Sequence, residues 1–316
     1  MRLVGFVEYN ASMTRLGALI SHDRVLEIGG GGVRDLLHYI ELGMPRADEI
    51  SEVIATTAIG QKKITVNGHT YTVFNRADVR QFVPFTPRSL RDFYAFEQHV
   101  KTANENRGRS VPSEWYQMPV FYYSNTSAIL TDGDIIPYPS YSSALDYELE
   151  IACVIGKAGM NIAPEDAMRH IAGFMIFNDW SARDEQRREM SVGLGPAKGK
   201  DFASSLGALV TPDELVDRAT DRPGVYDLTM IARVNGEERS HGNMRDLYYS
   251  FGQMIERASR DVMLRPGDVI GSGTVGTGCL LELTKGDGPW LQPGDVVELE
   301  IERLGVLRNT VGEKTM

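Results

Sequence analysis

The chain has 316 residues, of which 42% are hydrophobic and 24% charged, so wholesale disorder is excluded and one large domain or two smaller ones are expected. Its 43 acidic residues outnumber its 33 basic residues, and the formal charge of −10 argues against a nucleic acid or an anionic membrane as the main partner. The acidic excess also allows some carboxylates to cluster around a cation.

The sequence predicts neither a secretory signal nor a membrane span. Arg2 stands near the start, but Glu8 interrupts the first apolar segment before a signal-peptide core can form. No run approaches the ~20 apolar residues that a spanning helix needs. Two cysteines, Cys153 and Cys279, cannot build a disulfide framework and are expected to be small buried side chains in a reducing compartment. We therefore expect a cytoplasmic protein.

The first 85 residues are predicted to form a small α+β domain. Asn67 and Gly68 are a hairpin-turn signal inside an alternating stretch. The proline-punctuated connector at 83–88 places the boundary between residues 1–85 and residues 86–316. The predicted strands of the first domain span 2–8 and 63–74, and its predicted helices, which follow a four-glycine run at 29–32, span 33–42 and 47–58.

The remainder is rich in strands without a regular alternation of strand and helix, so a doubly wound parallel sheet is not expected. The fold class predicted is α+β, mainly β, with a mixed and mostly antiparallel sheet architecture and peripheral helices. Strands are predicted at 127–130, 145–155, 171–177, 206–211, 228–234, 269–270 and 296–301, and helices at 90–104, 164–170, 181–189 and 244–259.

Two glutamates alternate along the predicted strand at 145–155. Because residues two apart share one face of a strand, Glu148 and Glu150 point the same way while Leu149 and Ile151 point the other. One interpretation is a half-buried strand whose polar face meets water. The other is a pair of hard oxygen ligands for Mg²⁺, Mn²⁺ or Ca²⁺. The segment by itself is compatible with both.

A second polar string, residues 178–186, follows an apolar strand and opens a helix. Asp179 falls at this junction, where ligand side chains are commonly presented, although a capped surface helix is the simpler interpretation. Arg183 and Gln186 are three apart and share a helix face. The glycine-rich loop at 194–202 carries Lys200 and allows the backbone to approach a ligand, or forms a plain surface turn.

Two further segments hold candidate polar groups. Asp92 and His99 are two turns apart on the predicted helix 90–104 and would face one side, although a lone histidine is more often structural or solvated than catalytic. Residues 271–278 contain G-x-G-x-x-G, but the residues after them look strand-like and no βαβ unit surrounds them. A loop that offers backbone N–H groups to a carboxylate is therefore favoured over a dinucleotide site.

Taken together, these segments resemble the fumarylacetoacetate hydrolase family over most of residues 90–305. The string at 178–184, Asn-Asp-Trp-Ser-Ala-Arg-Asp, combined with the Glu-Leu-Glu strand at 148–150, is the most specific part of the resemblance. The matching motifs are Asp92 to His99, Pro119 to Tyr122, Glu148 to Glu150, Asn178 to Gln186, Gly195 to Lys200, Gly271 to Thr274, Glu282, and Pro293 to Asp295.

The resemblance implies the family's mixed β-roll or sandwich catalytic domain and a divalent-cation cofactor, Mg²⁺, Mn²⁺ or Ca²⁺. It assigns His99 as the general base, Glu282 as the carboxylate that orients it, and Lys200 as a further catalytic group. It implies that the metal ligands are Asp92, Glu148, Glu150 and Asp179, and that Tyr94, Tyr122, Arg183, Gln186 and Thr274 contact the substrate.

The leading hypothesis is a metal-dependent hydrolase that cleaves a C–C bond in an acylpyruvate-type β-diketone such as fumarylacetoacetate, in aromatic catabolism. Asp92 favours this branch, because the isomerase and decarboxylase branches lack that aspartate and carry a glutamate where this chain has Thr102. The alternatives are a lyase or isomerase of 2-oxo acids, such as an oxaloacetate decarboxylase or a 2-hydroxyhepta-2,4-diene-1,7-dioate isomerase, and a non-catalytic metal-binding protein.

Three further expectations come from the resemblance. The family implies a homodimer that acts on a small diketo or 2-oxo acid. It places an arginine shortly after the histidine, for which Arg107 and Arg109 are both candidates. Asn125 stands where the animal enzymes carry an arginine.

Overall fold

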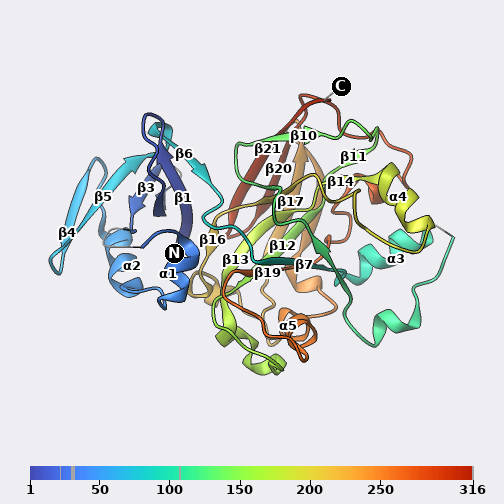
Figure 1. Ribbon diagram of the computed structural model, residues 1–316, viewed down its shortest axis with the longest axis horizontal. Coiled ribbons are helices and arrows are strands. Elements are labelled where there is room, and N and C mark those ends of the chain that lie inside the picture. The colour runs from blue at the N-terminus through green and yellow to red at the C-terminus, as the bar shows by residue number, and fades with distance from the viewer. Residues whose placement is uncertain (22, 30–32, 107, 315–316) are drawn as a thin grey trace.

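The structure is a computed structural model that describes residues 1–21, 23–29, 33–106 and 108–314. Its N-terminal part, blue in Figure 1, lies to one side of the larger β-rich body. The elements of this part are β1 (Arg2–Glu8), β2 (Arg15–Ser21), β3 (Arg24–Glu27), α1 (Leu36–Glu41), α2 (Ala47–Thr56), β4 (Lys63–Val66), β5 (His69–Asn75), the 3-10 turn η1 (Arg76–Asp78) and β6 (Val79–Phe82).

The larger body combines strands from two larger sheets and the two-stranded sheet β11-β14 with short helices at its periphery. Its strands are β7 (Ser89–Phe93), β8 (Phe121–Ser124), β9 (Ile129–Leu130), β10 (Ile135–Tyr138), β11 (Leu145–Asp146), β12 (Leu149–Ile155), β13 (Ile171–Asn178), β14 (Ser181–Ala182), β15 (Ser204–Leu206), β16 (Leu209–Val210), β17 (Thr229–Val234), β18 (Glu237–Asn243), β19 (Asp268–Gly271), β20 (Val296–Ile301) and β21 (Gly305–Lys314). Its helices are α3 (Glu97–Glu105), η2 (Ser113–Tyr116), η3 (Pro164–His170), α4 (Arg183–Ser191), η4 (Pro212–Arg218), η5 (Met244–Asp246), α5 (Phe251–Ser259) and α6 (Leu280–Leu283).

One large mixed sheet runs through both parts in the order β4-β5-β3-β2-β1-β16-β13-β12-β19-β7-β8. The N-terminal part joins it where β1 pairs with β16. A second sheet, β10-β21-β20-β17-β18, contacts β12 and β13 of the first and so forms a second layer (Figure 1). The predicted α+β, mainly β class with mostly antiparallel pairing is confirmed.

Strand β12 lies at the centre, and its two faces pack into different cores. Leu149, Ile151 and Cys153 pack in the core shared with the second sheet. Ala152 and Val154 pack in a core that also contains side chains of the N-terminal part. This sharing shows that the two parts are packed together, and the division at residue 85 stays a prediction.

Several predicted elements need correction. The predicted helix 90–104 is wrong in its first half, because residues 89–93 form β7, which pairs with β19 and β8, and only residues 97–105 form a helix, α3. Within β7 the Ser89 hydroxyl donates to Asp268 at 2.7 Å, which links this strand to β19. The strand-like stretch after residue 278 is the short helix α6.

Other predictions are confirmed. Asn67 and Gly68 form a hairpin turn between β4 and β5 with positive φ angles of 50° and 81°. Both cysteines are buried and free. Three of the four glycines at 29–32, on which the predicted start of the first helix relied, lie outside the described residues. None of the described helices is long and apolar enough to cross a membrane.

Candidate active site

Three predicted metal ligands meet at the end of β7 and the start of β12. One carboxylate oxygen from each of Asp92, Glu148 and Glu150 lies within 4.8 Å of the others. The sheet brings them together, because β19 lies between β12 and β7 and pairs Gly271 with Asp92. Glu148 and Glu150 are 5% and 0% exposed, so the interpretation of a water-facing strand is wrong.

The fourth predicted ligand, Asp179, follows β13 and is fully buried. Its Oδ2 atom pairs with Lys200 Nζ at 2.6 Å and also accepts from the Tyr122 hydroxyl, which lies between Asp179 and Asp92. Lys200 also reaches Glu148 Oε2 at 2.5 Å. The interpretation of residues 178–186 as a capped surface helix is therefore wrong, and Lys200 belongs to the cluster rather than to a surface turn.

The charges in this cluster do not balance. Arg183 pairs with Glu148 and with Asp146, both at 2.8 Å. In the described part of the chain no cation pairs with Asp92 or Glu150. Burial, reinforced by the neighbouring Asp179, raises the pKa of Asp92 from 3.8 to about 7.

The pKa values of the two glutamates in the cluster shift in opposite directions. Burial, together with Asp92 and Glu148, raises the pKa of Glu150 well above its ordinary value. Burial also opposes ionisation of Glu148, but Lys200 and Arg183 outweigh it and lower its pKa. A site that keeps an excess of buried carboxylate is one that a bound cation would stabilise.

The glycine-rich loop after β19 binds two of these carboxylates. The backbone N–H of Gly273 donates to Asp92 Oδ1 at 3.1 Å and to Glu150 Oε2 at 3.0 Å. Gly273 has a φ of +78°, and a Cβ there would lie 2.4 Å from the carbonyl oxygen of Phe93. The predicted role of this loop as a carboxylate-binding backbone is thus confirmed, with the protein's own side chains as the carboxylates.

The residues present suit a divalent cation. Asp179 Oδ1 is buried and has no hydrogen-bond partner among the described residues, which is an orphaned acceptor beside a crowded set of hard oxygens. Carboxylate oxygens are the ligands preferred by Mg²⁺, Mn²⁺ and Ca²⁺. Asp92, Glu148, Glu150 and Asp179 would hold the ion.

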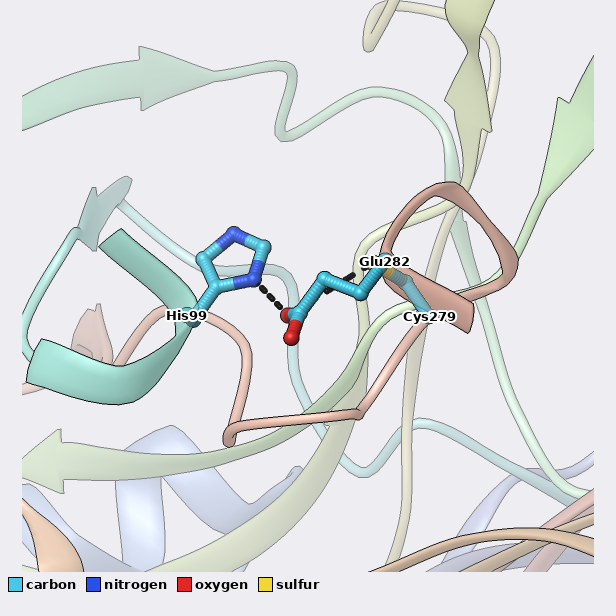
Figure 2. A group of neighbouring side chains, drawn as sticks. All are labelled: His99, Cys279 and Glu282. Atoms are coloured by element: carbon cyan, nitrogen blue, oxygen red, sulfur yellow. Dashed lines mark hydrogen bonds and ion pairs between the residues drawn. The ribbon is translucent and has the colours of Figure 1, made fainter. Parts of the chain in front are cut away.

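A histidine–glutamate pair lies on the other side of the site. His99, on α3, and Glu282, on α6, are 6% exposed each and are joined through His99 Nδ1. Glu282 Oε2 also accepts from the backbone N–H of Thr277 at 2.8 Å. Figure 2 shows the second ring nitrogen of His99 pointing away from Glu282, with Cys279 beside the backbone end of the Glu282 side chain. A carboxylate in this position would accept from Nδ1–H and would leave Nε2 free to accept a proton.

A cavity of about 370 Å³, here called the inner cavity, joins the histidine to the carboxylates. Asp179 and Glu282 are not among its lining residues but contact two of them, Lys200 and His99. The ring of Tyr94 meets that of His99 edge to face at 5.2 Å between centroids. The predicted site residues that line the inner cavity are Asp92, Tyr94, His99, Tyr122, Glu148, Glu150, Arg183, Gln186, Lys200 and Thr274.

The model of one protein family, described as "Fumarylacetoacetate (FAA) hydrolase C-terminal", matches residues 89–312. The chain belongs to the fumarylacetoacetate hydrolase family. The match contains the carboxylate cluster, the histidine–glutamate pair and the inner cavity, so the recognition made from the sequence motifs is confirmed.

Two relatives and one solved structure are similar to this chain. The human protein named oxaloacetate tautomerase FAHD2A, mitochondrial, is 31% identical over 98% of this chain and 91% of its own length. A fumarylacetoacetase from Oryza sativa subsp. japonica is 31% identical over 66% of this chain and 60% of its own length. A solved maleylpyruvate hydrolase from Sphingobium sp. SYK-6, in complex with manganese (II) ion and pyruvate, shares the fold with a TM-score of 0.71, 21% identity and full coverage of both chains.

Some members of the site were not predicted. Asp146 is fully buried and accepts from the backbone N–H groups of Leu280 and Leu281. It also accepts from Arg183 Nε at 2.8 Å. Its position two residues before Glu148 on the same alternating strand was a signal that could have found it. The sequence indicated the loop at 271–278 as a whole, but not that Gly273 binds both Asp92 and Glu150, because these two carboxylates lie far away in the sequence.

The structure describes two of the three further residues that the resemblance singled out. Asn125 donates to the carbonyl of Asp201 at 2.9 Å and so packs against the chain beside Lys200. Of the two candidate arginines, Arg107 lies outside the described residues, and Arg109 lines a second cavity next to the inner one.

Proposed function

We propose that this protein is a divalent-metal-dependent enzyme that interconverts the keto and enol forms of 2-oxo dicarboxylic acids, with oxaloacetate as the reference substrate. The observation that carries the proposal is the buried His99–Glu282 pair, whose histidine lines the same cavity as the carboxylates and Lys200. The name and full-length match of the human relative support this substrate class.

The proposed chemistry needs one mobile proton and a stabilised enolate. His99 Nε2 would take the proton from the carbon next to the 2-oxo group, and the imidazolium would then give this proton to the enolate oxygen, which completes the enol. In the reverse direction the proton would leave the enol oxygen and return to the carbon through the same ring nitrogen. Glu282 would stabilise the imidazolium that forms, since it already accepts from Nδ1. A divalent cation, when bound, supplies Lewis-acid polarisation of the 2-oxo group.

The cationic side chains would act on the negative charge that develops. Lys200 and Arg183 border the inner cavity and are buried, so their charges act in a medium of low dielectric constant. Both already pair with Glu148, which fixes their positions. The Tyr122 hydroxyl donates to Asp92 at 2.8 Å, which would hold the Tyr122 side chain in place in the wall of the inner cavity.

C–C bond hydrolysis of an acylpyruvate is the second candidate, and it was the leading hypothesis from the sequence. Asp92 favours it, because this carboxylate is part of the cluster as that branch requires, and a rice relative is named fumarylacetoacetase. The same His99 would then activate water instead of moving a proton on carbon. The longer coverage of the human relative supports placing tautomerisation first.

A paired assay separates the two. Purified protein with Mn²⁺ is mixed with freshly dissolved enol oxaloacetate, and the loss of enol absorbance is compared with the uncatalysed rate. The same protein is incubated with a panel of acylpyruvates, and the acid products are identified. No acceleration of enol loss would refute the first proposal, and two acids released from an acylpyruvate would support the second.

The assembly and location remain proposals. We propose a homodimer, which sedimentation would contradict by giving a single species at the chain mass of 35.1 kDa. The cytoplasmic location also stays a prediction, and the human relative is named as mitochondrial.

A further inference from the structure

A second cavity of about 540 Å³, here called the outer cavity, adjoins the inner one. The two share lining residues from α3, α4 and α6, among them Arg183, Gln186 and Leu281. The inner cavity is lined by buried side chains such as His99 and Glu148, whereas Arg109, Arg187 and Lys285 in the outer cavity are exposed. The outer cavity therefore lies between the inner cavity and solvent.

Positive charge gathers in the outer cavity although the whole chain carries −10. Arg109, Arg187 and Lys285 line it, and Asp287 is the one carboxylate among its described lining residues. In the described part of the chain no carboxylate pairs with Arg187 or Lys285. By contrast, the next residue on α4, Arg188, pairs with Glu185 at 2.7 Å and lines neither cavity.

The helix α4 sets the distance between the two positions of charge. Arg183 and Arg187 are one turn apart, which corresponds to about 6 Å along the helix axis. With carbon–carbon bonds of about 1.5 Å, an extended chain with about five bonds between its carboxyl carbons spans a similar distance. Oxaloacetate is shorter than this, and a six-carbon 2-oxo diacid fits it.

We propose that Arg187 and Lys285 form a carboxylate-binding subsite at the outer end of the active site, which favours 2-oxo acids with a second carboxylate at the far end of an extended chain. This inference rests on the proposed function for the identity of the inner group. Arg187 would offer its guanidinium as a paired donor and Lys285 its ammonium as a point charge, both to one carboxylate. Because both are exposed, the selectivity they give falls as salt is added.

Calorimetry with two matched probes tests the subsite. The Mn²⁺-loaded protein is titrated at low ionic strength with 2-oxoadipate and with its distal monomethyl ester, which keeps the chain length and removes the second charge. An exposed ion pair contributes up to about a fivefold difference in affinity, so a three- to tenfold preference for the diacid is expected from the parent protein. The double variant Arg187→Ala/Lys285→Ala should bind both probes alike.

Arg188→Ala is the matched control, since it removes the same charge from the same helix and should keep the preference for the diacid. Equal binding of diacid and ester by the parent, a preference kept by the double variant, or a preference lost equally in Arg188→Ala would each overturn the subsite. The tautomerase assay is read separately. A diacid preference that depends on Arg187 and Lys285 would support the subsite even if oxaloacetate were not turned over, and the failure would then lie in the proposed function.

Discussion

Removing the divalent cation should make the stability of this protein depend on pH in a defined direction. Asp92 is 2% exposed, and burial together with the nearby Asp179 raises its pKa from 3.8 to about 7. Between these two values the folded chain holds a proton on Asp92 that the unfolded chain has lost. The free energy of unfolding of the metal-free protein must therefore fall as the pH rises through this range.

The size of the effect follows from the shift. Each pKa unit corresponds to about 1.4 kcal/mol, and integration of the proton difference from pH 5 to pH 7 gives a loss of about 2 kcal/mol for Asp92 alone. Glu150 has a raised pKa and acts in the same direction. The pKa of Glu148 is lowered, so its contribution to stability changes only below the ordinary pKa of a glutamate and does not alter the change between pH 5 and pH 7. For 316 residues, an unfolding entropy of about 2 cal/mol/K per residue converts this loss to about 3 °C in the melting midpoint.

The effect is measured by thermal unfolding at pH 5, 6 and 7, once in chelator and once in Mn²⁺. The ionic strength is matched with K⁺. A bound cation favours the ionised carboxylates, so the midpoint gained from Mn²⁺ should grow from pH 5 to pH 7 by at least about 3 °C. If the midpoint of the chelated protein does not fall over this range, or if the gain from Mn²⁺ is the same at each pH, the assignment of the buried carboxylates as the cation site is refuted.

Four substitutions test the remaining parts of the site. His99→Ala should lower turnover in steady-state assays about 10²–10⁴-fold and leave Mn²⁺ affinity unchanged. Near-parental turnover would contradict its role as the base. Glu282→Gln should give a smaller loss of turnover. Glu148→Gln should weaken Mn²⁺ binding measured by calorimetry, because one hard anionic ligand is lost, and parental affinity would return the strand to a structural role. Gly273→Ala should lower the melting midpoint and weaken Mn²⁺ binding together, because a Cβ at φ +78° meets the Phe93 carbonyl at 2.4 Å, and an unchanged midpoint would contradict that contact.

Local patterns in the sequence determined several features of this protein. The alternation of Glu148 and Glu150 with Leu149 and Ile151 placed the two carboxylates on one face of a strand, because the period of two is a property of the extended backbone. Asn67-Gly68 specified its hairpin for the same local reason. The family motifs then connected the carboxylates with His99 and Glu282 before any geometry was available.

The tertiary structure decided how those groups meet. The sequence around Asp92 predicted a helix that would place it two turns before His99, yet residues 89–93 form a strand because β19 supplies its partner from about 180 residues away. Asp92 therefore reaches the cluster through strand pairing, and His99 reaches it from the helix that follows. Pairing energy between distant segments has no local signature. For the same reason the sequence did not predict that the Gly273 N–H binds both Asp92 and Glu150, nor that Arg187 and Lys285 line one cavity.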